Sequence, residues 1–331
     1  MKFSFRPCLA LLGGLVLFGS VSSAQDLGQQ LQKMGSDAAK GYISPILSGW
    51  AADMNSAIYY SADLHSVLGF DVGVKLGLAR PTDADKTYSL TLPAQIATPF
   101  GNLHANTDYD QVVTANSAVG DKAPTDVKMK STSIYYPAYL AAGSPPILEL
   151  PGGFNLPAVP LPVPQVDIGL PLGLEVMGRF VPTISAGDEG KFSATGFGLR
   201  YSIDQWLPLF PVNVAADFMT QSYKFKDKND NDLLTGKGTA YGVEVSKSLF
   251  LLTIYGGFQL EKGSFSVNSF QGTNPADPSQ TITVPGFSVD GKNTSRFTAG
   301  VRLLLLIINV HAEYSFSKTP VAALGVGLSI R

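Results

Sequence analysis

The sequence has almost no cysteine, little charge, no basic excess and no long apolar run beyond its first residues. Cys8 is the only cysteine among 331 residues. It lies in a segment that we expect to be removed, which excludes disulfides, thiol nucleophiles and cysteine metal ligands from the mature chain. Charged residues make up 15%, well below the roughly 25% of ordinary soluble domains. The formal net charge of −2 offers no basic surface for nucleic acid.

The first residues predict export. Basic residues precede an apolar stretch at 9–18, and a run of small residues ends with Ala24. This order is typical of a cleaved signal peptide, here residues 1–24. Beyond it, the longest apolar run is 303–308, far short of the ~18 residues that a membrane helix needs. A soluble periplasmic domain and an outer-membrane barrel remain as alternatives.

Residues 25–65 carry apolar side chains at helical spacing. One stripe contains Ile43, Leu47 and Trp50. We therefore predict a short N-terminal helical segment over 25–65. Packing against neighbouring structure explains such a stripe better than cofactor binding does, so these three residues are candidates for a plug.

From residue 66 onward the period changes to two. In FDVGVKLGLA, residues 70–79, large apolar residues alternate with Asp, Lys, Gly and Ala. The polar face of a soluble sandwich would be rich in Lys, Glu and Thr. Glycine, serine and scattered charges of both signs suit the crowded, wet lumen of a barrel whose apolar face contacts lipid. We predict an all-β membrane protein, an antiparallel outer-membrane β-barrel of about 12 strands over 66–331.

The alternation also predicts individual strands and loops. The predicted strands are 66–79, 87–97, 107–115, 128–138, 166–181, 192–203, 212–224, 236–246, 251–267, 293–303, 306–317 and 321–331. Bacterial barrels have even strand numbers, so ten and 14 strands are the alternatives. With both termini in the periplasm, the longer links near 185–191, 226–232, 268–292 and 317–320 are external. The shorter turns near 204–211, 247–250 and 304–305 are then periplasmic, as barrel topology requires.

Polar residues on the inward face are the candidate functional residues. They are Asp71, Lys75, Arg179, Arg200, Asp217, Glu244, Gln259, Glu261, Arg296, Arg302, His311 and Glu313. We expect opposite charges to pair across the lumen, with the tuning of solute passage as the alternative.

The sequence predicts no catalytic, cofactor-binding or metal-binding residue. No histidine has the spacing of a metal site. His311 and Ser315 share one strand face, but four residues on a strand span roughly 13 Å, so the two cannot hydrogen-bond. A nucleophile needs its base within hydrogen-bond reach. The chain is therefore not expected to be an enzyme.

Residues 137–171 depart from the barrel pattern. Their nine prolines cannot donate to a strand ladder and favour an extended chain. Their leucine, valine and isoleucine side chains must be buried somewhere. We predict that an apolar insertion at 137–165 leaves the barrel on the periplasmic side. There it packs against the plug candidates and narrows the pore.

The block ELPGGFNLPAVPLPVPQVDIGLP, read with the upstream GYISPILSGWAADMNSAIYYSA, resembles a family of uncharacterised bacterial outer-membrane barrel proteins. The resemblance covers nearly the whole mature chain and implies architecture without an assigned chemistry. A looser architectural likeness is to long-chain fatty-acid transporters of the outer membrane. Those proteins place N-terminal helices in the barrel and move hydrophobic molecules, but their sequence motifs are absent here.

The leading interpretation is a passive channel or transporter of the bacterial outer membrane. Its solute is small, and hydrophobic if it shares the apolar surface of the proline-rich insertion. A structural or interaction barrel with a blocked lumen is the alternative, and an outer-membrane lipid hydrolase is a third class. The expected partners are outer-membrane lipid, the barrel-assembly machinery and the solute. Neither nucleic acid nor a cofactor is expected.

Overall fold

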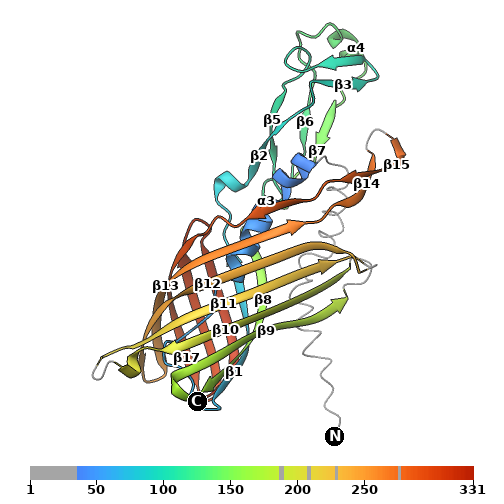
Figure 1. Cartoon of the computed structure of the whole chain (residues 1–331). Coiled ribbons are helices and arrows are strands. Elements are labelled where there is room, and N and C mark those ends of the chain that lie inside the picture. The colour runs from blue at the N-terminus through green and yellow to red at the C-terminus, as the bar shows by residue number, and fades with distance from the viewer. Residues whose placement is uncertain (1–35, 186–189, 207–209, 228–229, 275–276) are drawn as a thin grey trace.

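Ten antiparallel strands close into a barrel (Figure 1). The computed structural model describes residues 36–185, 190–206, 210–227, 230–274 and 277–331, so the predicted signal peptide and residues 25–35 lie outside the described residues. The strands are β1 Phe70–Ala79, β8 Val159–Leu170, β9 Leu174–Ser185, β10 Lys191–Ser202, β11 Asn213–Lys226, β12 Asp232–Leu249, β13 Leu252–Val267, β17 Ser295–Leu305, β18 Ile308–Phe316 and β19 Val321–Ile330. Each pairs with the next, and β19 pairs with β1. The predicted barrel is confirmed, but with ten strands rather than about 12.

Three of the segments predicted as barrel strands belong instead to an extension, residues 80–158. This extension stands at the upper end of the barrel in Figure 1. It contains β2 Thr87–Thr91, β3 Gln95–Thr98, β4 Gly101–His104, β5 Val112–Asn116, β6 Thr125–Val127, β7 Leu148–Leu150 and helix α4 Tyr136–Ala141. These strands form small two-stranded sheets. The barrel strands predicted at 87–97, 107–115 and 128–138 are therefore wrong. Alternation marks a half-buried strand, whether its apolar side meets lipid or a small protein core.

The proline-rich insertion was also misplaced. Its last residues form barrel strand β8, so the single strand predicted at 166–181 is in fact two strands joined by the turn 171–173. Strand β1 runs to the upper end and β8 returns from it, which puts the whole 80–158 link at that end. The C-terminus lies at the opposite, lower end (Figure 1). The insertion therefore does not emerge at the end that carries the C-terminus, where the sequence placed it.

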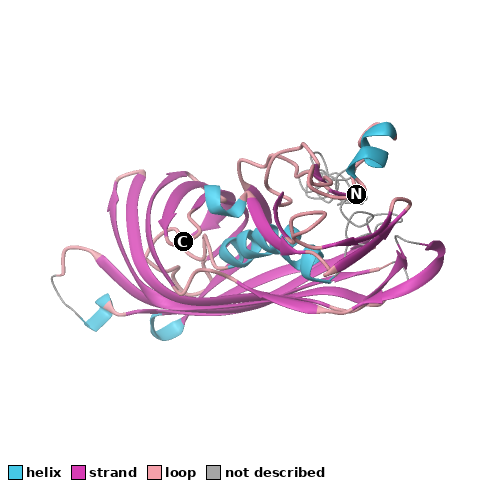
Figure 2. Cartoon of the chain, turned by 90° about the horizontal axis from the view of Figure 1, so that it is seen from above, coloured by secondary structure: helices cyan, strands magenta, loops and turns pink. Residues whose placement is uncertain are grey.

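Helix α3, Ser36–Met54, lies inside the ring of strands (Figure 2). It ends at Met54 rather than near residue 65, and the chain continues to β1 without regular structure. Among the described residues, no helix has the length and apolar character to cross a membrane. Three further strands lie near the upper end: β14 Phe270–Asn274 pairs with β15 Asp277–Val284, and β16 Phe287–Asp290 pairs with β13.

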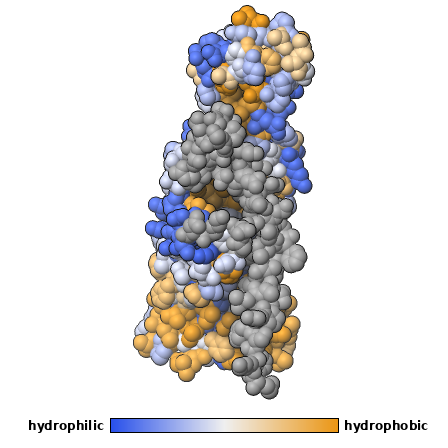
Figure 3. Space-filling model, turned by 90° about the vertical axis from the view of Figure 1, so that its right-hand side faces the viewer, coloured by the Kyte–Doolittle hydropathy of each residue, from blue (hydrophilic) through white to orange (hydrophobic). Residues whose placement is uncertain are grey.

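The two faces of the wall exchange character along the barrel axis. In the lower half, apolar residues point outward and polar residues inward, as predicted. On β13 this order ends at Glu261: Lys262 is exposed on the outside, whereas Phe265 is buried inside. On β11 the exposed Phe218 is followed by the buried Tyr223. Figure 3 shows the resulting hydrophobic lower part. Below this level the outer face of the wall is apolar and suits contact with lipid. Above this level the outer face is polar and suits contact with water, while the inner face packs into an apolar core.

Because of this boundary, two outward apolar positions are expected to differ in how much an arginine substitution destabilises the barrel. Val301 lies in the middle of β17, whereas Leu260 lies next to the polar level that begins at Lys262. Val301→Arg is expected to lower the free energy of unfolding in vesicles by about 2–4 kcal/mol, and Leu260→Arg by about 0–1 kcal/mol, because the penalty for arginine falls toward the membrane interface. Urea titrations of both variants measure the difference. Equal penalties would contradict the assigned boundary.

Candidate functional site: the closed barrel interior

The lower barrel lumen is filled by the protein's own chain. We call residues 51–65 the lumen segment. Residues 51–62 are all buried, and His65 is buried at the lower end. A backbone that crosses a lumen without regular structure needs hydrogen-bond partners for its amide and carbonyl groups. The inward side chains of the wall provide many of them.

Arg179 of β9 makes the densest set of these bonds. Its guanidinium donates to the carbonyl oxygens of Met54 (2.5 Å), Ser56 (3.0 Å) and Ala57 (3.3 Å). It also donates to the side chain of Gln221 (3.0 Å), which in turn donates to the Met54 carbonyl (2.6 Å). One arginine thus fixes the point where helix α3 ends.

Other wall residues hold the segment above and below this point. Arg296 donates to the Ala52 carbonyl (2.6 Å), Lys75 and Gln165 donate to the Ile58 carbonyl (3.0 and 2.9 Å), and Glu313 accepts from the Ala57 amide (2.9 Å). These four residues come from four different strands, so the segment is held around the lumen circumference. The contacts explain much of the predicted inward polarity without an open pore.

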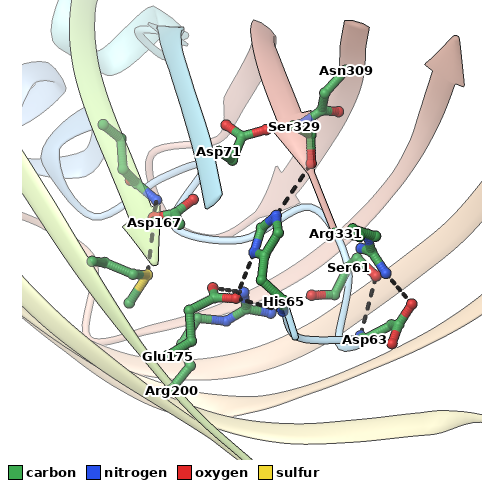
Figure 4. Close-up of polar contacts among 12 residues, drawn as sticks. Ser61, Asp63, His65, Asp71, Asp167, Glu175, Arg200, Asn309, Ser329 and Arg331 are labelled. Atoms are coloured by element: carbon green, nitrogen blue, oxygen red, sulfur yellow. Dashed lines mark hydrogen bonds and ion pairs between the residues drawn. The ribbon is translucent and has the colours of Figure 1, made fainter. Parts of the chain in front are cut away.

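A second group of contacts closes the lower end (Figure 4). The two nitrogens of the His65 ring lie 2.7 Å from Glu175 Oε2 and 3.1 Å from Ser329 Oγ. Arg200 donates to Glu175 Oε1 (2.5 Å) and to Glu244 Oε1 (2.8 Å from Nε), and it also bonds the Ser61 carbonyl. One guanidinium therefore bridges two buried carboxylates and the lumen segment.

Ser329, His65 and Glu175 have the spacing of a nucleophile, a base and an orienting carboxylate. Their surroundings favour a structural role. Ser329 is only 2% exposed, Arg302 donates to the same hydroxyl at 3.4 Å, and Arg200 occupies the second oxygen of Glu175. The trio ties the lumen segment to β9 and β19. His311 and Ser315 do not pair, in agreement with their predicted separation. The ring nitrogens of His311 have no partner among the described residues, and Ser315 bonds Arg296 and Thr298.

Tyr60 lies between cations in the middle of the lumen. The Lys75 ammonium is 5.2 Å and the Arg302 guanidinium 4.8 Å from its ring centroid, distances at which a cation is attracted to an aromatic face. His311 packs at 5.1 Å between ring centroids. This contact couples the lumen segment to β1, β17 and β18 without a hydrogen bond.

The structure buries all twelve inward-facing candidates in the barrel interior: Asp71, Lys75, Arg179, Arg200, Asp217, Glu244, Gln259, Glu261, Arg296, Arg302, His311 and Glu313. The expected pairing of opposite charges occurs for Arg200 with Glu175 and Glu244, and for Arg296 with Glu261. Lys75 and Arg179 instead bond backbone carbonyls of the lumen segment. For these two cations, bonds to the backbone that occupies the lumen replace the expected pairing with an opposite charge.

Sequence reasoning missed His65, Gln165 and Ser329 as members of this network. Gln165 follows the prolines of β8, and it alternates with apolar neighbours as an inward residue should. That alternation was the available signal, and the prolines obscured it. His65 and Ser329 are adjacent only because the chain turns from the lumen into β1 beside the C-terminus (Figure 4). Nothing local in the sequence predicts that contact.

The upper half of the interior is apolar. Ile43 and Leu47 of α3 are buried in it. The Trp50 ring stacks on Phe225, with 5.4 Å between ring centroids, and packs against Phe265, with 5.9 Å between ring centroids. The three plug candidates therefore lie inside the barrel, against its inner wall. Among the described residues, no group of three acidic, histidine or cysteine side chains could hold a metal ion.

The proline-rich strand contacts the same helix. Val159, Leu161 and Val163 of β8 belong to the core that contains Ile43 and Leu47, and the Trp50 indole donates to the Pro160 carbonyl at 3.2 Å. The predicted packing of this segment against α3 is therefore present. It lies in the upper half of the barrel, not at the end that carries the C-terminus.

Strands β8 and β9 part in this upper half. Their pairing ends at Gln165 and Arg179. Above it, β8 pairs only with β1, and the rest of β9 pairs only with β10. We call this unpaired boundary the seam.

Proline placement explains the seam. The Gly169 amide donates to the Gly69 carbonyl on the β1 side. Successive amides point to opposite sides of a strand, so even-numbered amides of β8 face β9. Pro160, Pro162 and Pro164 occupy three successive even positions above the last pair. Proline has no amide hydrogen to donate, so β8 can pair with β1 while its β9 edge stays open.

Solved structures similar to the chain are outer-membrane proteins. Ail of Yersinia pestis is 10% identical with a TM-score of 0.22, over 80% of this chain and 99% of that one. The β domain of a Bordetella autotransporter, BrkA, is 9% identical with a TM-score of 0.31, over 80% and 99%. The translocator domain of NalP from Neisseria meningitidis is 8% identical with a TM-score of 0.27, over 85% and 92%.

Among curated proteins nothing matches the chain. One family model covers residues 1–330, and its description is "Family of unknown function (DUF6588)". The match spans the barrel, the extension and the lumen segment together. The chain belongs to this family.

Proposed function

We propose that the chain is a bacterial outer-membrane barrel that handles a hydrophobic molecule at the seam and does not conduct water-soluble solutes along its axis. The membrane location is supported by the apolar outward band of the lower half, which ends on β13 at the exposed Lys262. The short turns at 171–173, 250–251 and 306–307 lie at the lower end, and the links 80–158 and 268–294 lie at the upper end. Barrels of this membrane have short periplasmic turns and longer external loops, so the lower end is assigned to the periplasm.

A closed axis argues for binding at the side. The lumen segment is buried and bonded to the wall over the whole lower half, which leaves the upper apolar interior as the place for a solute. The single observation that carries the proposal is the seam, where three prolines keep the wall unpaired beside that apolar interior. Figure 3 shows hydrophobic residues at mid-height on one side of the molecule. We propose binding and passage, without catalysis.

Trp50 is a natural reporter for this proposal, because its indole is bonded to the seam strand. In the Trp206→Phe chain, which leaves Trp50 as the single tryptophan, a brominated long-chain fatty acid is expected to quench the fluorescence in a saturable way. Aqueous iodide should quench much less. A matched chain with Pro160→Thr, Pro162→Thr and Pro164→Thr regains amide donors on the β9 edge and should be quenched more slowly. Absence of saturable quenching would leave a structural barrel with a blocked lumen as the better interpretation.

A further inference from the structure

The turns at the lower end carry an unusual combination of residue and backbone conformation. Leu68, Leu172, Phe250 and Leu306 all have positive φ angles, of 66°, 66°, 58° and 58°. They are exposed by 78%, 80%, 97% and 93% respectively. Each lies at the lower end of the barrel, either in a turn between two strands or just before β1. Left-handed backbone is unfavourable for large side chains and is normally occupied by glycine or asparagine.

The rest of the described chain follows that ordinary preference. Its other non-glycine residues with positive φ are Ala57, Asn106, Ser144, Asn155 and Asp230. Large apolar residues therefore occupy this conformation only at one end of the barrel, within the described residues. A turn tip that faced water would have a reason to be asparagine or glycine and none to be leucine or phenylalanine.

Leu68, Leu172, Phe250 and Leu306, which we call the turn tips, continue the lipid-facing band. On β17 the outward apolar residues run from Phe297 to Leu305, and the exposed Leu306 and Ile307 follow directly. Eight steps at ~3.3 Å per residue give ~26 Å along the strand, or ~20 Å across the membrane at a tilt of ~40°. The apolar band of outer-membrane barrels is about 25 Å tall. The strands alone fall short of that height, and the apolar tips lie where the remainder is needed.

We infer that the turn tips at the lower end are inserted in the lipid of the inner leaflet and form the lowest ring of the barrel's membrane contact. This inference rests on the proposed membrane location. The partner is the acyl region of the bilayer, because the tips are contiguous with the lipid-facing strands. The left-handed leucines and phenylalanine are retained because glycine or asparagine in this ring would remove apolar contact.

Single-tryptophan chains test the position of the tips. In a Trp50→Phe, Trp206→Phe background, we would add Leu306→Trp, Phe250→Trp or, as a reference in the lipid-facing band, Val301→Trp. In vesicles of phosphatidylcholine with brominated acyl chains, all three tryptophans are expected to be quenched by the lipid and protected from aqueous acrylamide. If Val301→Trp is quenched by lipid and the tip tryptophans only by acrylamide, the barrel is in the membrane and this inference is wrong. If none is quenched by lipid, the membrane location itself fails.

The direction in which the urea midpoint moves in a second variant provides a measurement that does not depend on tryptophan. Leu306→Asn relieves the left-handed strain and removes an apolar side chain. A tip in lipid predicts a lower urea midpoint for this variant in vesicles, whereas a tip in water or on an absent partner protein predicts an unchanged or higher midpoint. Leu306→Met is the matched control: it keeps the apolar contact and the strain, so its midpoint should remain near that of the parent chain. A raised midpoint for Leu306→Asn would overturn the inference.

Discussion

Replacing Arg200 with methionine is expected to lower the free energy of unfolding in vesicles by about 3–5 kcal/mol, the loss seen when one partner of a buried ion pair is removed. The arginine lies between Glu175 and Glu244, and all three side chains are almost completely buried. Methionine fills much of the volume but leaves two carboxylates facing each other without a cation. The same change removes a donor to the Ser61 carbonyl, so the lumen segment also loses an attachment.

The design of the measurement separates this effect from a general loss of charge. Lys237→Met removes a cation from an exposed outward position of β12, where substitution is expected to change stability by less than about 0.5 kcal/mol. Urea titrations of the two variants, with tryptophan fluorescence as the signal, give the comparison. If Arg200→Met were no more destabilising than Lys237→Met, the bridge between Glu175 and Glu244 would not be a principal support of the interior.

The barrel itself could be predicted from the sequence because its signal is local. The alternation along β17, β18 and β19 indicates which side chains face lipid, and it can be recognised in each strand separately. The extension shows the limit of this signal. Strands β2 and β5 alternate in the same way, yet they pair with each other in a small sheet outside the wall. The pattern reports that one face is buried, but not what covers it.

Strand β8 shows a different limit. Proline was taken as evidence against a strand, because it cannot donate to a ladder on both sides. In β8 the missing donors at Pro160, Pro162 and Pro164 all fall on the unpaired edge, so the strand needs only one partner there. The spacing of the prolines, two residues apart, was the clue. Prolines at every second position predict a strand with one unpaired edge, whereas prolines at irregular spacing predict a loop.

The contacts of the lumen segment could not be predicted, because they depend on three-dimensional closure. Arg179 and Arg296 were correctly placed on the inward face from strand alternation alone. Besides wall side chains, their partners include the backbone carbonyls of Met54, Ser56, Ala57 and Ala52, which have no side-chain signature. A helix was therefore expected to continue to residue 65. The wall arginines make an alternative set of bonds available, and the helix ends where those bonds begin.

Removal of the lumen segment is expected to have the largest effect on conductance. The full chain should give current at the noise level in a planar bilayer, because residues 51–62 fill the lumen and are bonded to several strands around it. A chain without residues 36–65 should give discrete single-channel steps. A barrel of about eight strands is already filled by its own side chains. Ten strands enclose more space, which here holds a main-chain segment, and water would enter once that segment is gone.

The shortened chain must be shown to form a closed barrel before its current is measured. A folded barrel resists detergent until it is heated, so a gel shift on boiling identifies the folded fraction, and only that fraction is reconstituted. The shortened chain also loses the apolar contacts of α3 with β8 and β13, so a second variant keeps the helix and removes attachments only. Arg179→Ala combined with Arg200→Ala should give intermittent openings, because the segment then retains its place but fewer bonds to the wall. Steady current through the full chain, or silence from the folded shortened chain, would contradict the assignment of the lumen segment as the barrier.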